Sequence, residues 1–331
     1  MTINIKKVIL SRKGFDSVAG GDYSRVDPAT GKYILIPIPE TENSAKFYKY
    51  KDIRVTPNYL SDIDADDLED LIFKLGMNKQ ARNSAIGYAH FDPWLGPYPW
   101  LEKDDKDNHK IGAFGQQGIA LRHLIKQEVA TEQGVTNGSL FLFYSRFKPF
   151  SNVKENPKAR EQPAVNIDSQ GAYFIYGWLK VGSIIDTRDR LDPDVKALLE
   201  NKHPHYHNLI PGEDEIFLGA EFLDEDKKIR GFGYFHELAP KFMLSKPDDK
   251  TRIHPATKPT IWELPGFFYR NDEHKNERLT YLKDKIWVKN EDSDKANMTE
   301  LKGYGQEFVF DTSKDVKGLE SWLMNMFSNN A

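Results

Sequence analysis

The sequence contains no cysteine among its 331 residues. Disulfide bonds, thiolate catalysis and cysteine-ligated zinc or iron–sulfur sites are therefore excluded, and a chain without cysteine fits a reducing compartment. No apolar run approaches the roughly 18 residues that a membrane helix needs, and the N-terminus lacks the apolar segment of a signal peptide. These absences predict a soluble, cytoplasmic protein that does not contact a membrane.

Several signatures of well-understood chemistry are also missing. There is no dinucleotide-binding fingerprint, and no glycine-rich phosphate loop followed by Lys-Ser/Thr. The serines form neither a nucleophile elbow nor a Ser-x-x-Lys pattern. Because no internal repeat or low-complexity linker divides the chain, we expect a single domain over residues 1–331. The sequence does not identify a cofactor.

The composition is that of a globular protein. Hydrophobic residues make up 39% of the chain and aromatic residues 12%, which is enough for a sizeable core. Charged residues reach 29% with both signs interspersed, and the net charge is −4. This balance argues against tight, non-specific binding of phosphate backbones, although one basic face is sufficient to bind a nucleic acid.

Strand patterns dominate the centre of the chain, and helical patterns lie around them. Apolar and aromatic runs predict strands over residues 8–10, 139–144 and 173–181. Apolar residues at helical spacing predict helices over residues 64–75 and 116–133. The fold class expected from this order is α+β, with a central mixed or antiparallel sheet and several flanking helices.

The first polar motif follows the first predicted strand. Residues 12–17 read Arg-Lys-Gly-Phe-Asp-Ser. Arg12 and Ser17 are suited to bind a phosphate or a ribose, and Asp16 to act as a general acid or base. The alternative is a solvated turn in which the aspartate or serine caps the backbone.

A second motif ends the strand that precedes residue 91. In an extended segment His90 and Asp92 face the same side, which suits proton transfer between imidazole and carboxylate. The alternative is again a capped turn, because Asp-Pro often opens one.

Residues 114–118 (Phe-Gly-Gln-Gln-Gly) precede the longest helical pattern. Free N–H groups at a helix start attract anions, and the side chains of Gln116 and Gln117 can both donate and accept hydrogen bonds, as a base edge requires. His123 lies within two turns of that start. Ordinary helix initiation is the alternative.

Three histidines alternate in residues 203–207 (His-Pro-His-Tyr-His). His203, His205 and His207 would present nitrogens to a metal ion if the segment were a strand. Pro204 disfavours a regular strand, and no acidic residue stands at ligand spacing. We therefore favour contact with a substrate or phosphate over a metal site, and assign no metal ligand.

Aromatic residues on the predicted central strands are candidates to stack on a base. Trp178 alternates with Tyr176, so the two share a face of the strand. Stacking on a flipped base is one interpretation, and packing in the core is the other.

The order of these motifs resembles that of the third family of nucleotide modification associated domains. The segments that carry the resemblance are residues 7–17, 36–39, 89–93, 114–116, 123–124, 138–144, 174–179, 203–205, 262–265 and 305–309. A weaker local similarity relates residues 138–144 and 173–182 to strands of PUA-like barrels, including the EVE type, which bind modified bases in an aromatic pocket.

The resemblance implies a nucleotide or DNA substrate, because the family occurs in systems that modify bases in the DNA of phages and bacteria. The polar positions that it carries over are Arg12, Asp16, Ser17, His90, Asp92, Gln116, His123, Trp178, His203, His205 and Gln306. Other proteins of such a system are the implied partners.

Three functions fit these motifs. The first is an enzyme that acts on a modified base or nucleotide, in DNA modification or in defence against modified phage DNA, with Asp16, His90 and Asp92 in acid–base roles. The second is a reader that binds a modified base without chemistry and recruits a partner. A purely structural role in a modification complex is a third possibility.

Overall fold

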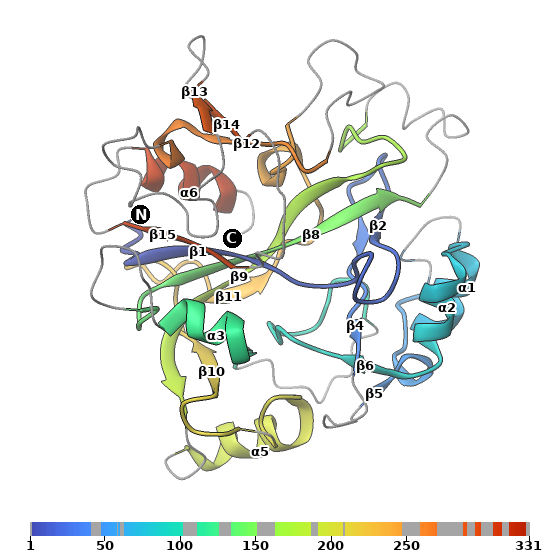
Figure 1. Ribbon diagram of the computed structural model, residues 1–331, viewed down its shortest axis with the longest axis horizontal. Helices are drawn as coiled ribbons and strands as arrows, with labels where there is room; N and C mark the ends of the chain where they lie inside the picture. Colours follow the sequence, from blue (N-terminus) through green and yellow to red (C-terminus); the bar gives the residue numbers. More distant parts are fainter. Residues whose placement is uncertain are drawn as a thin grey trace.

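Two long antiparallel strands, β8 (Leu140–Pro149) and β9 (Ala172–Ile185), form the middle of a large curled mixed sheet, a half-barrel (Figure 1). From one edge to the other the strand order is β15 (Glu307–Asp311), β1 (Lys7–Arg12), β8, β9, β10 (Asp214–Gly219) and β7 (Ala113–Gln117). The computed structural model describes residues 2–40, 48–57, 59, 63–101, 111–125, 134–150, 163–186, 191–207, 209–246, 259–269, 287–289, 295–298, 307–312 and 318–328.

β8 is longer than its neighbour β1, so two strands pair with the same edge of β8, one after the other. β1 runs parallel to the first half of β8 and ends at Arg12, opposite Tyr144. β2 (Ser24–Val26) then runs parallel to the second half and pairs with β3 (Tyr33–Ile34). The loop between β1 and β2 therefore leaves the sheet beside the middle of β8, which is where the predicted Arg12–Ser17 motif lies.

Aromatic side chains hold the curl together. The ring of Phe114 on β7 lies 5.0 Å from Phe141 and 5.1 Å from Phe143 on β8, and 5.9 Å from Phe217 on β10. All four side chains are fully buried. Because each such pair adds about 0.5–1.5 kcal/mol to the gain from burying the rings, this cluster fixes an edge strand against the middle of the sheet.

Smaller elements surround this sheet. Two further three-stranded sheets have the orders β4 (Ile38–Pro39), β6 (Tyr88–His90), β5 (Tyr48–Lys49) and β12 (Trp262–Pro265), β14 (Lys295–Met298), β13 (Trp287–Lys289). β11 (Phe232–Tyr234) pairs with β9. The described α-helices are α1 (Leu68–Lys74), α2 (Lys79–Ala85), α3 (Gly118–Ile125), α5 (Pro193–Lys202) and α6 (Leu319–Phe327), and the short 3-10 helices are Tyr50–Asp52, Pro240–Phe242 and Gly266–Phe268.

The structure confirms the α+β class and the central strands. It corrects the helix predicted over residues 116–133, because Gln116 and Gln117 still belong to β7, where they pair with β10, and the helix begins at Gly118. Residues 126–133 lie outside the described part of the chain. β10, the partner strand of β7, is distant in the sequence, so the helical spacing alone placed the start of the helix too early.

Among the described residues, no helix has both the length and the apolar character needed to cross a membrane.

Glu215 on β10 is a half-buried carboxyl group within this sheet. Its burial raises its pKa from 4.5 to about 7, and the nearby carboxylate of Asp186 adds to the shift. Since the folded state binds this proton more tightly than the unfolded state, the contribution of Glu215 to stability falls as the pH rises from about 4.5 through 7.

We therefore expect Glu215→Gln to raise the melting temperature relative to wild type more at pH 8 than at pH 5. Thermal unfolding at the two pH values measures this difference. Glu213→Gln, an exposed neighbour, is the control and should show no such dependence. An equal difference in melting temperature between Glu215→Gln and wild type at both pH values would contradict the raised pKa of Glu215.

Candidate functional site

A pocket of about 220 Å³ lies where several strand ends meet. Its walls come from the end of β1, the loop that follows it, β4, the end of β6, the end of β7 and the segment after α5. The predicted site residues that line it are Arg12, Asp16, His90, Asp92, Gln116, Gln117 and His205. Motifs that are far apart in the sequence therefore share one cavity.

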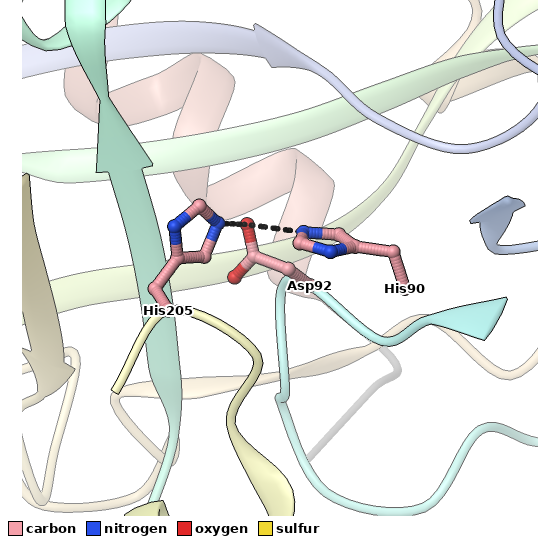
Figure 2. Close-up of side chains that lie close together, drawn as sticks. All are labelled: His90, Asp92 and His205. Atoms are coloured by element: carbon pink, nitrogen blue, oxygen red, sulfur yellow. Dashed lines mark ion pairs between the residues drawn. The ribbon is translucent and has the colours of Figure 1, made fainter. Parts of the chain in front are cut away.

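Asp92 is the buried centre of one side of this pocket. Its Oδ1 accepts a hydrogen bond of 2.8 Å from the backbone N–H of Gly115, and His203 Nε2 lies 3.4 Å from the same oxygen. Its Oδ2 faces His205 Nε2 at 3.6 Å and His90 Nε2 at 4.0 Å (Figure 2). Burial by itself would raise the pKa of Asp92, but His203 and His205 outweigh it and hold this pKa well below its usual range.

A second carboxylate orients His90. Nδ1 of His90 lies 2.6 Å from Oε2 of Glu40, which follows β4. β4 pairs with β6, with Ile38 opposite His90, so the sheet itself brings Glu40 to the imidazole. The contact turns the other ring nitrogen, Nε2, towards Asp92. His90 ends β6, as predicted, and its imidazole faces Asp92. The prediction assumed an extended segment, whereas the chain turns here, and the Asp92 N–H donates to the His90 carbonyl at 3.2 Å.

The backbone of Gly115 forms the floor beneath His205. A Cβ atom at this position would lie 2.3 Å from His205 Cδ2 and 2.5 Å from its Cγ. No side chain fits in that gap, so glycine is required for the imidazole to lie against β7. The same residue donates its N–H to Asp92, and it thereby positions two groups of the pocket.

Glu307 at the start of β15 is the buried acceptor on the other side. Its Oε1 accepts hydrogen bonds from Gln116 Nε2 at 2.6 Å and from Ser11 Oγ at 3.3 Å, and Lys13 Nζ lies 3.5 Å away. Burial raises the pKa of Glu307, and the Lys13 ammonium opposes this shift without cancelling it. Lys13 also lies over the ring of Phe114, 4.6 Å from its centroid.

The loop after β1 combines a capped turn with an ion pair. Oδ1 of Asp16 accepts hydrogen bonds from the N–H groups of Val18 at 2.7 Å and Ala19 at 2.6 Å. Its Oδ2 lies 2.9 Å from an Arg12 guanidinium nitrogen. The turn predicted as the alternative reading is therefore present, and the same carboxylate also holds Arg12 at the pocket.

Other predicted residues lie outside the pocket lining. Ser17 is exposed in its turn, and His203 is buried behind Asp92. Trp178 packs against Phe235 and Phe327, and its indole N–H donates to the carbonyl of Arg230 at 2.9 Å. The structure therefore gives Trp178 a packing role.

The structure does not describe the side chains of the two remaining predicted positions. His123 lies on α3, but its side chain is not among the described ones. Gln306 lies outside the described residues. Neither position adds to the geometry of the pocket given above.

Sequence reasoning missed Glu40, Gly115 and Glu307 as members of the site. Glu307 directly follows Gln306 in a motif of the resemblance, and Glu40 directly follows residues 36–39, another segment of the resemblance, so both had a local signal. Each partner of these carboxylates lies far along the chain: Gln116 and Glu307 are 191 residues apart. Spacing in the sequence does not reveal such a pairing.

The fold and pocket define a class: α+β proteins in which strand ends of a half-barrel present imidazole, carboxylate, amide and cationic groups to one small cavity. The chain matches the family described as nucleotide modification associated domain 3 over residues 7–311. It belongs to that family, as the motif order predicted, and a role in nucleotide or DNA modification systems follows at that level. No curated protein and no solved structure matches the chain, and the similarity to PUA-like barrels stays a prediction.

We expect Lys13→Met to lower the free energy of unfolding at pH 8 by about 3 kcal/mol, because it leaves the buried Glu307 carboxylate without its cation. The loss should shrink at pH 5, where Glu307 takes up a proton more easily. Denaturant unfolding at both pH values measures it.

The double variant Lys13→Met/Glu307→Gln should recover at least half of that loss, since it removes the uncompensated charge. Lys228→Met is the control, because Lys228 forms an exposed ion pair with Asp226 and should unfold like wild type. A Lys13→Met protein as stable as wild type at pH 8 would refute the role of the pair.

Proposed function

We propose that the protein is an enzyme that acts on a base or nucleotide, in DNA modification or in defence against modified phage DNA. The observation that carries this proposal is that two chemically different sets of side chains line one pocket. Arg12 and Lys13 supply cations, and His90, Asp92 and His205 supply imidazole and carboxylate groups. Cations bind phosphate, and imidazole–carboxylate sets support proton transfer.

The size and lining of the pocket favour a base or another part of a nucleotide. Its volume of about 220 Å³ is below the roughly 300–1,000 Å³ of pockets that enclose drug-sized ligands, so it encloses part of a nucleotide and not a larger ligand. The planar guanidinium of Arg12 suits two phosphate oxygens at once. Gln116 and Gln117 line the same cavity. Glu307 holds the Gln116 amide, and the exposed Gln117 amide can donate to and accept from a base edge.

The reacting part of the substrate would face His90 and Asp92. Glu40 orients the His90 ring, as a carboxylate orients the imidazole in acid–base sites. Both oxygens of Asp16 are already engaged, so in this proposal Asp16 holds Arg12 and does not exchange protons. Base excision, base tailoring and nucleotide transfer are all compatible with this arrangement.

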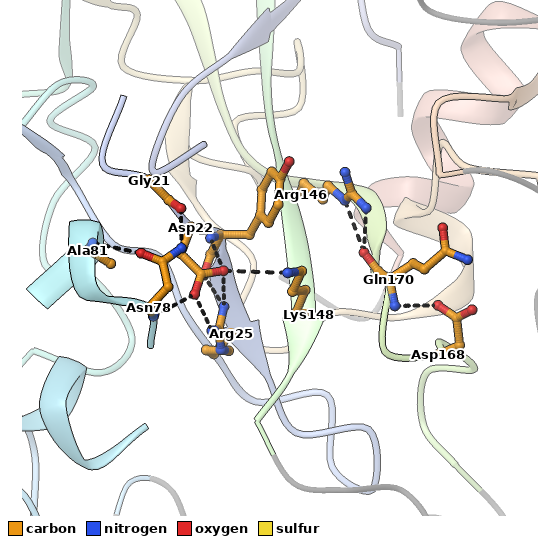
Figure 3. Close-up of polar contacts among 10 residues, drawn as sticks. Gly21, Asp22, Arg25, Asn78, Ala81, Arg146, Lys148, Asp168 and Gln170 are labelled. Atoms are coloured by element: carbon orange, nitrogen blue, oxygen red, sulfur yellow. Dashed lines mark hydrogen bonds and ion pairs between the residues drawn. The ribbon is translucent and has the colours of Figure 1, made fainter. Parts of the chain in front are cut away.

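Two cations lie on β8 beyond Tyr144, which is opposite Arg12, and they favour DNA over a free nucleotide. The Arg146 guanidinium lies 4.3 Å and Lys148 Nζ 4.9 Å from the centre of the Tyr23 ring. Arg146 is held by the carbonyl of Gln170, and Lys148 by Asp22 (Figure 3). Cations that alternate with aromatic rings are suited to bind a nucleic-acid strand. An extruded base would then enter the pocket while its strand follows β8.

A reader is the second candidate. The observation that favours it is that Gln116 and Gln117 can read a base edge without any chemical step. A reader has no need of the buried Asp92 with its surrounding imidazoles, so we place the enzyme first.

We expect incubation with the purified protein to change the nucleosides of hypermodified phage DNA, as a released base or a shifted nucleoside mass in mass spectrometry. His90→Ala should lower the rate at least 100-fold, in line with the loss of an acid–base group, and keep the wild-type circular dichroism spectrum. His236→Ala, an exposed histidine, is the control. Unchanged DNA across unmodified and hypermodified substrates, together with saturable binding, would select the reader.

A second experiment concerns Arg146 on β8. Arg146→Gln should weaken binding of single-stranded DNA and reduce the slope of log affinity against log salt by about 1, because one phosphate contact is lost. Fluorescence anisotropy at several salt concentrations measures the slope. Arg54→Gln, an exposed arginine elsewhere, should leave it unchanged. An identical slope for Arg146→Gln would exclude this path for the strand.

A further inference from the structure

Three groups suited to bind a metal ion face one another on one side of the pocket. His90 ends β6, Asp92 follows two residues later, and His205 lies in the segment after α5. One nitrogen or oxygen from each residue lies within 4.8 Å of the other two. Figure 2 shows the Asp92 carboxylate between the two imidazole rings. All three side chains line the cavity.

The separations of these atoms fit an ion better than direct hydrogen bonds. Asp92 Oδ2 lies 3.6 Å from His205 Nε2 and 4.0 Å from His90 Nε2, which is beyond hydrogen-bond distance. Metal bonds of about 2.0–2.2 Å hold neighbouring ligand atoms roughly 3.0–3.6 Å apart. Shifts of the imidazoles by less than about 1 Å would therefore close the three groups around one ion.

The contacts behind these three residues orient them as ligands. Glu40 Oε2 lies 2.6 Å from His90 Nδ1, and a carboxylate on the outer nitrogen is the usual support of a metal-bound histidine. Gly115 N–H occupies Oδ1 of Asp92, which leaves Oδ2 to face the histidines. Gly115 also leaves the space in which the His205 ring lies against β7.

We propose that His90, Asp92 and His205 bind one divalent transition-metal ion, Fe²⁺ or Zn²⁺, whose open coordination positions face the pocket. Two imidazoles and one carboxylate with open positions suit these ions, whereas Mg²⁺ and Ca²⁺ prefer oxygen ligands throughout. The site deepens the proposed function: with an ion bound, His90 and Asp92 would serve as ligands, and water on the ion would supply the acid–base group that the proposed function assigns to them. Metal binding itself does not depend on which substrate is used.

This assignment differs from the interpretation of the sequence, which favoured substrate contact for the histidines of residues 203–207. His207 is exposed, and its Nε2 lies 2.7 Å from the carbonyl of Glu200. The acidic ligand missing from the local sequence is Asp92, which only the fold brings to His205. The alternating histidines are therefore not one ligand set.

The test is metal content and affinity of the untagged full-length protein. The protein is stripped with a chelator, dialysed, and reloaded with Zn²⁺, with Fe²⁺ under anaerobic conditions, or with Mg²⁺. Elemental mass spectrometry after a second dialysis should find about one equivalent of Zn²⁺ or Fe²⁺ and no retained Mg²⁺. The absorption of the Co²⁺-loaded protein should show ligand-field bands of a nitrogen- and oxygen-coordinated ion.

Variants then identify the ligands. His205→Ala should lower the affinity for Zn²⁺ at least 100-fold, and Glu40→Gln should lower it 10–100-fold as the loss of a supporting contact does. His207→Ala and His236→Ala are matched controls and should bind as wild type does. Circular dichroism checks folding, and Glu40→Gln with the Co²⁺ spectrum decides the question if His205→Ala does not fold.

Two results would overturn the site: less than a tenth of an equivalent of Zn²⁺ and Fe²⁺ in the wild-type protein, or equal losses for His207→Ala and His205→Ala. Stoichiometric metal with unchanged DNA would keep the site and reject the enzyme. Changed DNA in the fully chelated protein would keep the enzyme and reject a metal role in turnover.

Discussion

The hydrogen bond between Gln116 and Glu307 connects the two edge strands of the curled sheet, β7 and β15. Its length is 2.6 Å, and Glu307 is completely buried. A buried carboxylate needs partners to offset the loss of water, and Ser11, Lys13 and Gln116 are the partners within reach. The edges of the half-barrel therefore meet at the ends of β1 and β7, and the pocket lies at this meeting point.

Asp92 is a second buried carboxylate that connects segments distant in the sequence. One of its oxygens is bound by the backbone of β7 through Gly115, and the other faces two histidines. Asp92 therefore connects its own segment, after β6, and the segment of His205, after α5, to the edge strand β7. Asp92 lines the pocket and lies beside imidazoles. Glu307 lies behind the lining and holds a cation, Lys13, and an amide, Gln116, that line it.

Local patterns predicted much of the fold. The runs at residues 8–10, 139–144 and 173–181 are strands because apolar and aromatic side chains favour a buried pleated surface, and the α+β class followed from them. The helix start near Gln116 was placed wrongly because the pairing of β7 with β10 overrides helical spacing. For Trp178 the sequence left stacking and packing open. The aromatic residues of α6 and of the segment after β11 provide its packing.

By itself, the sequence determined the positions of the polar strand ends and, through their order, membership of the family. These are properties of short segments, and a short segment carries its own signal. Only the tertiary structure decided that Arg12, His90, Gln116 and His205 line one pocket, that Glu40 supports His90, and that His207 does not belong with His205. The reason is that contacts between distant segments depend on the curl of the sheet and on the pairing demanded by buried charge, and no local pattern encodes either.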